Sequence, residues 1–132
     1  MYLLDTNIIL ELLLDQENAD EVEQLLRNIS PQSFHLSEFS LYSLGVILIR
    51  RNMHDLLVQS IEDLLITGGI RQVRLEVEDI QNIVNISQRF NLDFDDAYQY
   101  VVAEKYDLII VSFDRDFDRT ERGKRTPSQV LS

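Results

Sequence analysis

The stretch Met1-Tyr2-Leu3-Leu4-Asp5-Thr6-Asn7 is the part of the chain that decides the fold. Residues 2–4 are apolar without alternation, which is typical of a parallel strand that is covered on both faces. Asp5 follows directly, so it stands at the carboxyl end of that strand, the edge where open α/β sheets bind their ligands. Asp5 could equally be the N-cap of the next helix, and this stretch alone leaves both interpretations open.

Beyond this stretch, predicted strands alternate with predicted helices. Further strands are predicted at 33–37, 73–75 and 107–112. Apolar residues at helical spacing predict helices at 8–14, 19–29, 38–49, 55–66, 76–90 and 91–105. The helix at 38–49 is apolar on almost every side and should be buried, and residues 126–131 should form a short edge strand or a docking segment. The order predicts a three-layer α/β/α sandwich with a central parallel sheet of four to five strands, as a single domain over residues 1–132.

Composition excludes several classes of protein. The 132 residues include no cysteine, which rules out disulfides and thiolate metal sites, and no segment is apolar enough over about 20 residues to cross a membrane. We therefore expect a cytoplasmic protein. The net charge of −11 argues against indiscriminate binding to nucleic acid. Five basic residues nevertheless gather near the C-terminus and are candidates for phosphate contact: Arg115, Arg119, Arg122, Lys124 and Arg125.

Three acids are predicted to meet at one edge of the sheet. Asp5 and Asp114 each follow a predicted strand, and Asp96 lies in the first turn of the helix that leads into the second of these strands. Carboxylates that are brought together repel one another unless a cation neutralises them. Oxygen ligands favour hard divalent ions such as Mg²⁺ or Mn²⁺, which can activate water for phosphodiester hydrolysis. The pattern therefore indicates a metal-dependent nuclease.

The same residues resemble a known family, the PIN domains. The resemblance lies in Asp5-Thr6-Asn7 near the start, Asp96-Ala97 at a late helix and Ser112-Phe113-Asp114 after an apolar strand, and it spans nearly the whole chain. It implies that Asp5, Asp96 and Asp114 bind the metal while Asn7 and Ser112 orient them by hydrogen bonds. Ser112 stands where the family commonly has threonine.

One position departs from the family pattern. PIN domains usually carry a glutamate in the helix after the second strand, where this chain has Ser43. Glu38, at the end of that strand, and Asp118, four residues after Asp114, are the candidates to supply the missing acid. By contrast, we interpret the neighbouring acids Asp93, Asp95 and Asp116 as solvated first-turn or surface residues.

Two functions follow from the resemblance. The first is a metal-dependent endoribonuclease that cleaves RNA, of the kind found as the toxin of a toxin–antitoxin pair, with a small antitoxin-like protein as partner. The second, motivated by Ser43 and the acidic surface, is a catalytically impaired PIN-like domain that binds protein or RNA. PIN-like proteins often form homodimers, and the apolar helix at 38–49 could contribute to such an interface or belong to the core.

Overall fold

A four-stranded parallel sheet forms the centre of the protein in a computed structural model that describes all 132 residues. The strand order is β3-β2-β1-β4, where the strands are β1 (Tyr2–Leu4), β2 (Phe34–Ser37), β3 (Arg71–Val73) and β4 (Ile109–Val111). Every neighbouring pair is parallel, and Leu4 at the end of β1 is in register with Val111 at the end of β4. The residues that follow these two strands therefore emerge side by side at one edge of the sheet.

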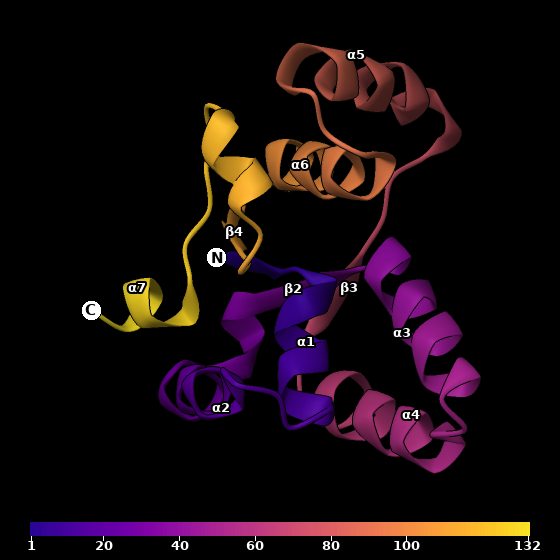
Figure 1. The fold of residues 1–132 in the computed structure, drawn as a ribbon, viewed down its shortest axis with the longest axis vertical. Coiled ribbons are helices and arrows are strands. Elements are labelled where there is room, and N and C mark those ends of the chain that lie inside the picture. The colour runs from indigo at the N-terminus through magenta and orange to yellow at the C-terminus, as the bar shows by residue number, and fades with distance from the viewer.

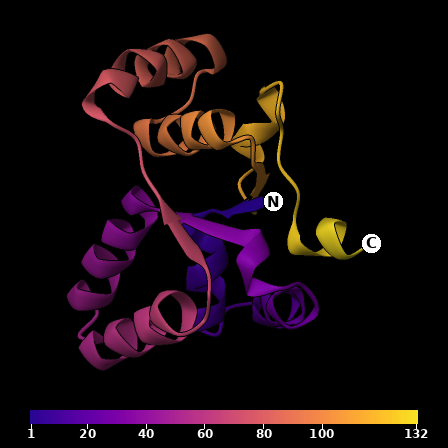
Figure 2. The same cartoon turned by 180° about the vertical axis from the view of Figure 1, so that it is seen from behind.

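Helices cover both faces of the sheet, as a three-layer sandwich requires. In Figure 1, α5 (Ile80–Phe90) and α6 (Phe94–Tyr106) lie above the sheet. The helices α1 (Thr6–Leu13), α2 (Ala19–Asn28) and α4 (His54–Ile61) lie below it, and α3 (Glu38–Arg50) runs along the right-hand side. Figure 2 shows the same layers from behind. The predicted α/β/α sandwich is confirmed.

Alternate residues of the neighbouring strands β1 and β4 build the two halves of the core. Leu3 and Ile110 face α5 and α6, whereas Leu4 and Val111 face α1, α2 and α3. All four side chains are at most 1% exposed. Burying an aliphatic side chain of this size contributes about 1.5–3 kcal/mol, so the strands β1 and β4 are held from both sides. The edge at which they end is consequently a rigid place for functional groups.

The third strand lies two residues earlier than the sequence predicts. It spans Arg71–Val73, in register with His35–Ser37 of β2, and the predicted range 73–75 is wrong. Arg71 and Gln72 of this strand are exposed, so its sequence carries little apolar signal. Leu75 has already left the sheet, and its backbone N–H donates to the hydroxyl of Tyr98 at 3.2 Å.

The helix predicted at 55–66 consists of two parts. The regular helix α4 ends at Ile61, and a π-helical turn, η2 (Glu62–Ile66), completes it. Gly68 is required just after this turn, since a Cβ at that position would lie 2.0 Å from a main-chain carbonyl oxygen. Gly69 adopts the left-handed region with φ of +95°. The two glycines thus end this segment as the sequence predicts.

The C-terminal segment is a short helix and the predicted edge strand is wrong. Thr126 caps α7 (Pro127–Leu131) in a reciprocal pair with Gln129, and Pro127 occupies the first helical position. The helix docks on α2, where the N–H of Ser128 donates to Glu21 at 2.7 Å. Only Arg125 pairs with the sheet, through a single parallel bridge to Val111. The docking interpretation of this segment is therefore the right one.

One face of α3 is open, so the prediction of a helix buried on almost all sides is wrong. Leu44 and Leu48 are fully buried, but Tyr42, Val46 and Ile49 are 61%, 50% and 49% exposed. These three line a mainly apolar groove between α3 and α4.

No helix in the protein combines the length and the apolar character needed to cross a membrane. The remaining short turns are η1 (Pro31–Ser33), η3 (Val77–Asp79) and η4 (Arg115–Arg119).

Candidate functional site

Asp5 is both a helix cap and a part of a polar site. Its backbone is extended, its N–H continues the sheet by donating to the carbonyl of Val111 at 3.0 Å, and its carboxylate caps α1 by accepting from the N–H of Thr6 at 2.9 Å. Only 7% of the residue is exposed. The sequence left open whether Asp5 caps a helix or lies at the ligand-binding edge of the sheet, and in the structure it does both.

Three side chains complete the hydrogen bonding of Asp5. Its Oδ2 accepts from Ser112 Oγ at 2.7 Å and from Asn7 Nδ2 at 3.4 Å, while Oδ1 accepts from Gln99 Nε2 at 3.1 Å. Burial raises the pKa of Asp5, and the hydrogen bonds from Ser112, Gln99 and Thr6 oppose this effect. With four donors in total, both oxygens of Asp5 are occupied by the protein itself.

The segment after β4 places a second pair of acids beside Asp5. Ser112 Oγ accepts from the N–H of Asp114 at 2.9 Å, and Asp114 Oδ1 accepts from the N–H of Asp116 at 2.8 Å, which starts η4. Asn7 bridges from α1 by accepting from the N–H of Phe113 at 3.3 Å and donating to Ser112 Oγ at 3.2 Å. The two strand ends are thus joined by a continuous polar network.

The first turn of α6 brings Asp96 to these acids. Asp96 is 8% exposed, and one carboxylate oxygen from each of Asp96, Asp114 and Asp116 lies within 4.8 Å of the others. Burial raises the pKa of Asp96 to about 8, and the proximity of Asp114, Asp5 and Asp116 adds to the effect. In contrast to Asp5, these carboxylates are in electrostatic conflict with one another.

The donor set of these acids fits a divalent cation. Three carboxylate oxygens at this spacing, with no nitrogen or sulfur donor among them, match the preference of Mg²⁺ or Mn²⁺ for oxygen ligands. A cation would also favour the charged form of Asp96, whose pKa is raised first by burial and then by the neighbouring carboxylates.

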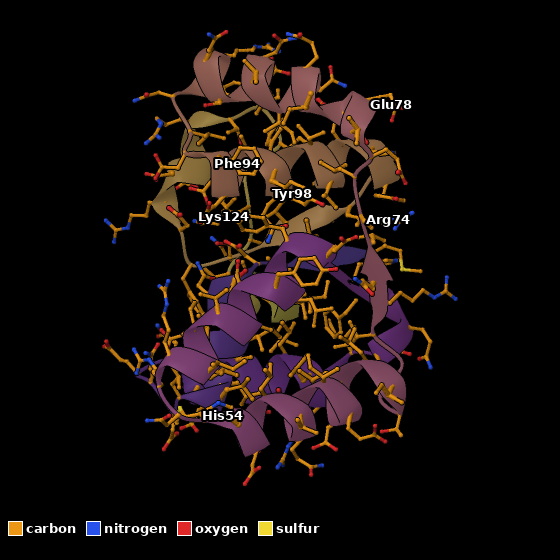
Figure 3. All side chains as sticks on the ribbon, turned by 90° about the vertical axis from the view of Figure 1, so that its right-hand side faces the viewer. His54, Arg74, Glu78, Phe94, Tyr98 and Lys124 are labelled. Atoms are coloured by element: carbon orange, nitrogen blue, oxygen red, sulfur yellow. The ribbon has the colours of Figure 1, made fainter.

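Asp5, Asp96 and Asp114 line a cavity that is open to solvent, and Asp116 lies beside it. It has a volume of about 240 Å³, and Asp5, Asp96, Asp114, Gln99 and Ser43 contribute to its wall. Phe39 of α3 closes one side by packing against α6, with ring-centroid distances of 6.1 Å to Phe94 and 5.3 Å to Tyr98. Figure 3 labels these two residues of α6. The cavity is large enough for ions and a phosphate group.

Comparison with known proteins identifies the family. The sequence model described as the PIN domain matches residues 2–123. The chain belongs to the PIN domain family. No curated protein sequence matches it.

Solved structures with the same fold include several PIN proteins from bacteria. A toxin–antitoxin complex from Klebsiella pneumoniae superposes with a TM-score of 0.76 at 20% identity, covering 96% of this chain and 98% of that one. FitAcB from Neisseria gonorrhoeae gives 0.75 at 24% identity, with 97% and 99% covered. VapC20 from Mycobacterium tuberculosis, described as a sarcin-ricin loop cleaving toxin, gives 0.76 at 19% identity, with 89% and 93% covered. At these identities the similarity shows the PIN fold.

Three residues of the site differ from the sequence-based interpretation. Asp95, interpreted as a solvated first-turn residue, is exposed but contributes to the wall of the cavity. Asp116, interpreted as a surface residue, belongs to the acidic group, because η4 turns the chain back towards Asp96. Gln99, three residues after Asp96, was not singled out. The sequence signal for Gln99 is that it lies on the same face of a buried helix as Asp96.

The two candidates for the missing acid lie elsewhere. Glu38 is not in the wall of the cavity and instead interacts with Tyr42, raising the pKa of that phenol. Asp118 is exposed and pairs with Lys124 at 3.1 Å. Ser43 does line the cavity. Neither Glu38 nor Asp118 contributes to its wall.

Most of the predicted basic contacts are engaged within the protein. Arg119 pairs with Asp116 at 3.0 Å, Arg122 with Asp107 at 3.0 Å, and Lys124 with Asp118. Arg115 and Arg125 are exposed and make no ion pair. Arg115, directly after Asp114, and Arg125 are therefore the two candidates for phosphate contact that remain without an ion pair.

Proposed function

We propose that this PIN-domain protein is a metal-dependent endoribonuclease of the toxin type, with Mg²⁺ or Mn²⁺ as its cofactor. Asp5, Asp96 and Asp114 form the metal-binding set, and Asp116 joins it. The observation that carries the proposal is the meeting of Asp96, Asp114 and Asp116 within 4.8 Å in a solvent-open cavity beside Asp5.

The cation would supply Lewis-acid stabilisation of the phosphate and a lowered pKa for the attacking water. The residues of the chain prepare the site for it. Ser112 holds Asp5 and the backbone of Asp114 at once, so the acids from the two strands keep a fixed separation. Phe39 and the two aromatic residues that it contacts cover the side of the cavity and restrict water there.

RNA is the proposed substrate and the cytoplasm the proposed site of action. Membership of the PIN family supports this proposal, as does the likeness to VapC20, a toxin that cleaves the sarcin-ricin loop. The net charge of −11 means that non-specific affinity for RNA is weak, so binding depends on local contacts such as Arg115. Weak non-specific affinity therefore fits the cleavage of one selected site in an RNA better than general RNA degradation.

A small antitoxin-like protein is the proposed partner. Structures of the same fold include a toxin–antitoxin complex and FitAB bound to DNA. The exposed apolar residues of α3, Tyr42, Val46 and Ile49, offer a surface for such a protein or for a second copy of this chain. Either assembly would remove this surface from water.

A catalytically impaired PIN domain that binds protein or RNA is the second candidate function. It is favoured by Ser43, which removes one acid from the cavity, and by Asp5, whose oxygens are already occupied by four donors. This candidate predicts stable binding to a partner without turnover.

A cleavage assay separates the two. Purified protein is incubated with a structured RNA in Mg²⁺, in Mn²⁺ and in excess chelator, alongside Asp96→Asn and, as a matched control at the start of the same helix, Asp93→Asn. The nuclease proposal expects cleavage that needs metal, disappears in Asp96→Asn and persists in Asp93→Asn, since Asp93 is exposed and is not in the wall of the cavity. Cleavage in chelator, or equal cleavage by Asp96→Asn, would contradict it, and binding without cleavage in either metal would favour the second candidate.

A further inference from the structure

Gln99 is an unusual residue for its position. It lies in the middle of α6 and is only 1% exposed, and the residues that follow it, Tyr100, Val101 and Val102, are buried and apolar or aromatic. A buried amide must find hydrogen-bond partners or it destabilises the fold. An apolar side chain would therefore be the simple choice here, and the presence of glutamine needs a reason.

The amide nitrogen of Gln99 connects three helices at the site. Nε2 donates to Asp5 Oδ1 at 3.1 Å and to Ser40 Oγ of α3 at 2.6 Å. Ser40 Oγ also accepts from Thr6 Oγ1 of α1 at 2.8 Å. Gln99 thus ties α6, which carries Asp96, to the helix that Asp5 caps.

The amide oxygen of Gln99 shows what determines its orientation. Oε1 is buried and is the one buried side-chain polar atom without a hydrogen-bond partner. If the amide group were rotated by 180°, Nε2 would lose its hydrogen bonds to Asp5 and Ser40. Oε1 would then face the carboxylate oxygen of Asp5, and two acceptors would repel each other. The contact with Asp5 therefore fixes the amide, even though one acceptor stays unsatisfied.

We propose that Gln99 is a positioning residue that holds the Asp5 carboxylate in place for cation binding, on the side of the cavity where Ser43 replaces the usual glutamate. Without a glutamate at that position, Asp5 has no acid partner from α3, and Gln99 together with Ser40 provides the link to α3 instead. The inference rests on the proposed metal-dependent function. It assigns Gln99 to the support of Asp5 rather than to direct contact with the metal.

A double-mutant cycle on Mn²⁺ affinity tests this role. Isothermal titration calorimetry gives the Kd for Mn²⁺ of the wild type, Gln99→Met, Asp5→Asn and the double variant. Supporting hydrogen bonds around a metal site typically contribute 10–100-fold in affinity, so Gln99→Met should weaken binding by about that factor. In the Asp5→Asn background the same change should weaken Mn²⁺ binding by less than about threefold, because the residue that Gln99 positions is already altered.

The control is Val102→Ala on the same helix. Val102 is fully buried and its truncation lowers the melting temperature, but it should leave the Kd for Mn²⁺ unchanged. If Gln99→Met does not fold, Gln99→Asn keeps the amide on a side chain one methylene shorter and should weaken binding in the same direction.

An unchanged Kd in a folded Gln99 variant overturns the proposal. So does equal weakening in the Asp5→Asn background, which would make Gln99 a ligand in its own right. If the wild type binds no Mn²⁺, the proposed metal-dependent function fails. The role of Gln99 is then decided by the carboxyl ¹³C resonance of Asp5 in the metal-free protein: Gln99→Met should shift it and Val102→Ala should not, and no shift in Gln99→Met rejects the role.

Discussion

Replacing Asp96 with asparagine should make the metal-free protein more stable. The pKa of Asp96 is raised from 3.8 to about 8 by burial and by the neighbouring carboxylates, so the folded state prefers a neutral group at this position. Asparagine is neutral, has nearly the same shape, and can donate to Asp114 as the protonated acid does. The substitution therefore removes a penalty and keeps the contact.

The size of the effect follows from the two pKa values. At pH 7 the group lies about 3.2 pH units above its unfolded pKa, and 1.36 kcal/mol per unit gives a penalty of about 4 kcal/mol as an upper limit. The cavity is open to solvent, which screens the charges, so we expect about 1–2 kcal/mol. For a domain of this length that corresponds to an increase of about 4–8 °C in melting temperature.

The same pKa values determine how the stabilisation by Asp96→Asn depends on pH. The pKa of Asp96 is higher in the folded than in the unfolded state, so the folded protein binds more protons between pH 3.8 and about 8, and its stability falls as pH rises through this window. The advantage of asparagine should therefore be full near neutral pH and fall to about a quarter by pH 4.5.

Thermal unfolding followed by circular dichroism in excess chelator measures this effect. Asp93→Asn is the control, and it should give no stabilisation because its exposed carboxylate only favours the helix N-terminus. Adding Mn²⁺ at about 100 times its Kd should raise the stability of the wild type by about 2.7 kcal/mol and that of Asp96→Asn by less. A metal-free Asp96→Asn that melts below the wild type at pH 7, or a gain that does not change with pH, would refute the reasoning.

Three further predictions concern the site and the fold. Ser43→Glu, which adds a carboxylate to the cavity, should tighten Mn²⁺ binding by about tenfold in calorimetry while lowering the metal-free melting temperature. Arg119→Ala releases the Asp116 carboxylate from its ion pair at 3.0 Å and should tighten Mn²⁺ binding a few-fold; weaker binding would mean that Arg119 orients the acid. Gly68→Ala, where a Cβ would lie 2.0 Å from a carbonyl oxygen, should cost at least about 1–3 kcal/mol in chemical denaturation, whereas Gly45→Ala, with no atom closer than 4.0 Å, should be neutral or stabilising.

The parts of the fold that the sequence predicts are those with strong local patterns. The uninterrupted run before Ser112 and the apolar residues before Asp5 identify β4 and β1, because strands covered on both faces need apolar residues throughout. Strand β3 carries no such pattern at the edge of the sheet and was misplaced. The terminal helix was missed although Thr126, followed by Pro127 and then Gln129, is a capping pattern.

The site was predictable only where strand ends specify it. Asp5 and Asp114 follow from the rule that the carboxyl ends of parallel strands share an edge, and the structure brings Asp96 to them. The position of Asp116 depends on a 3₁₀ turn, which no hydrophobic periodicity in the sequence predicts. Gln99 depends on a contact between residues 94 positions apart, and its burial is visible only once α6 is placed on the sheet.

The acids of the cavity are stabilised in two different ways, and this difference indicates where a cation is needed. Burial raises the pKa of Asp5, and the hydrogen bonds from Ser112, Gln99 and Thr6 oppose this effect. Asp96 has no such set of donors and faces Asp114 and Asp116, so burial and repulsion leave it partly protonated at neutral pH. In the proposed function, a divalent ion would relieve the repulsion among Asp96, Asp114 and Asp116. We therefore expect the proposed cation to matter most at Asp96, with Asp5 held beside it by its four donors.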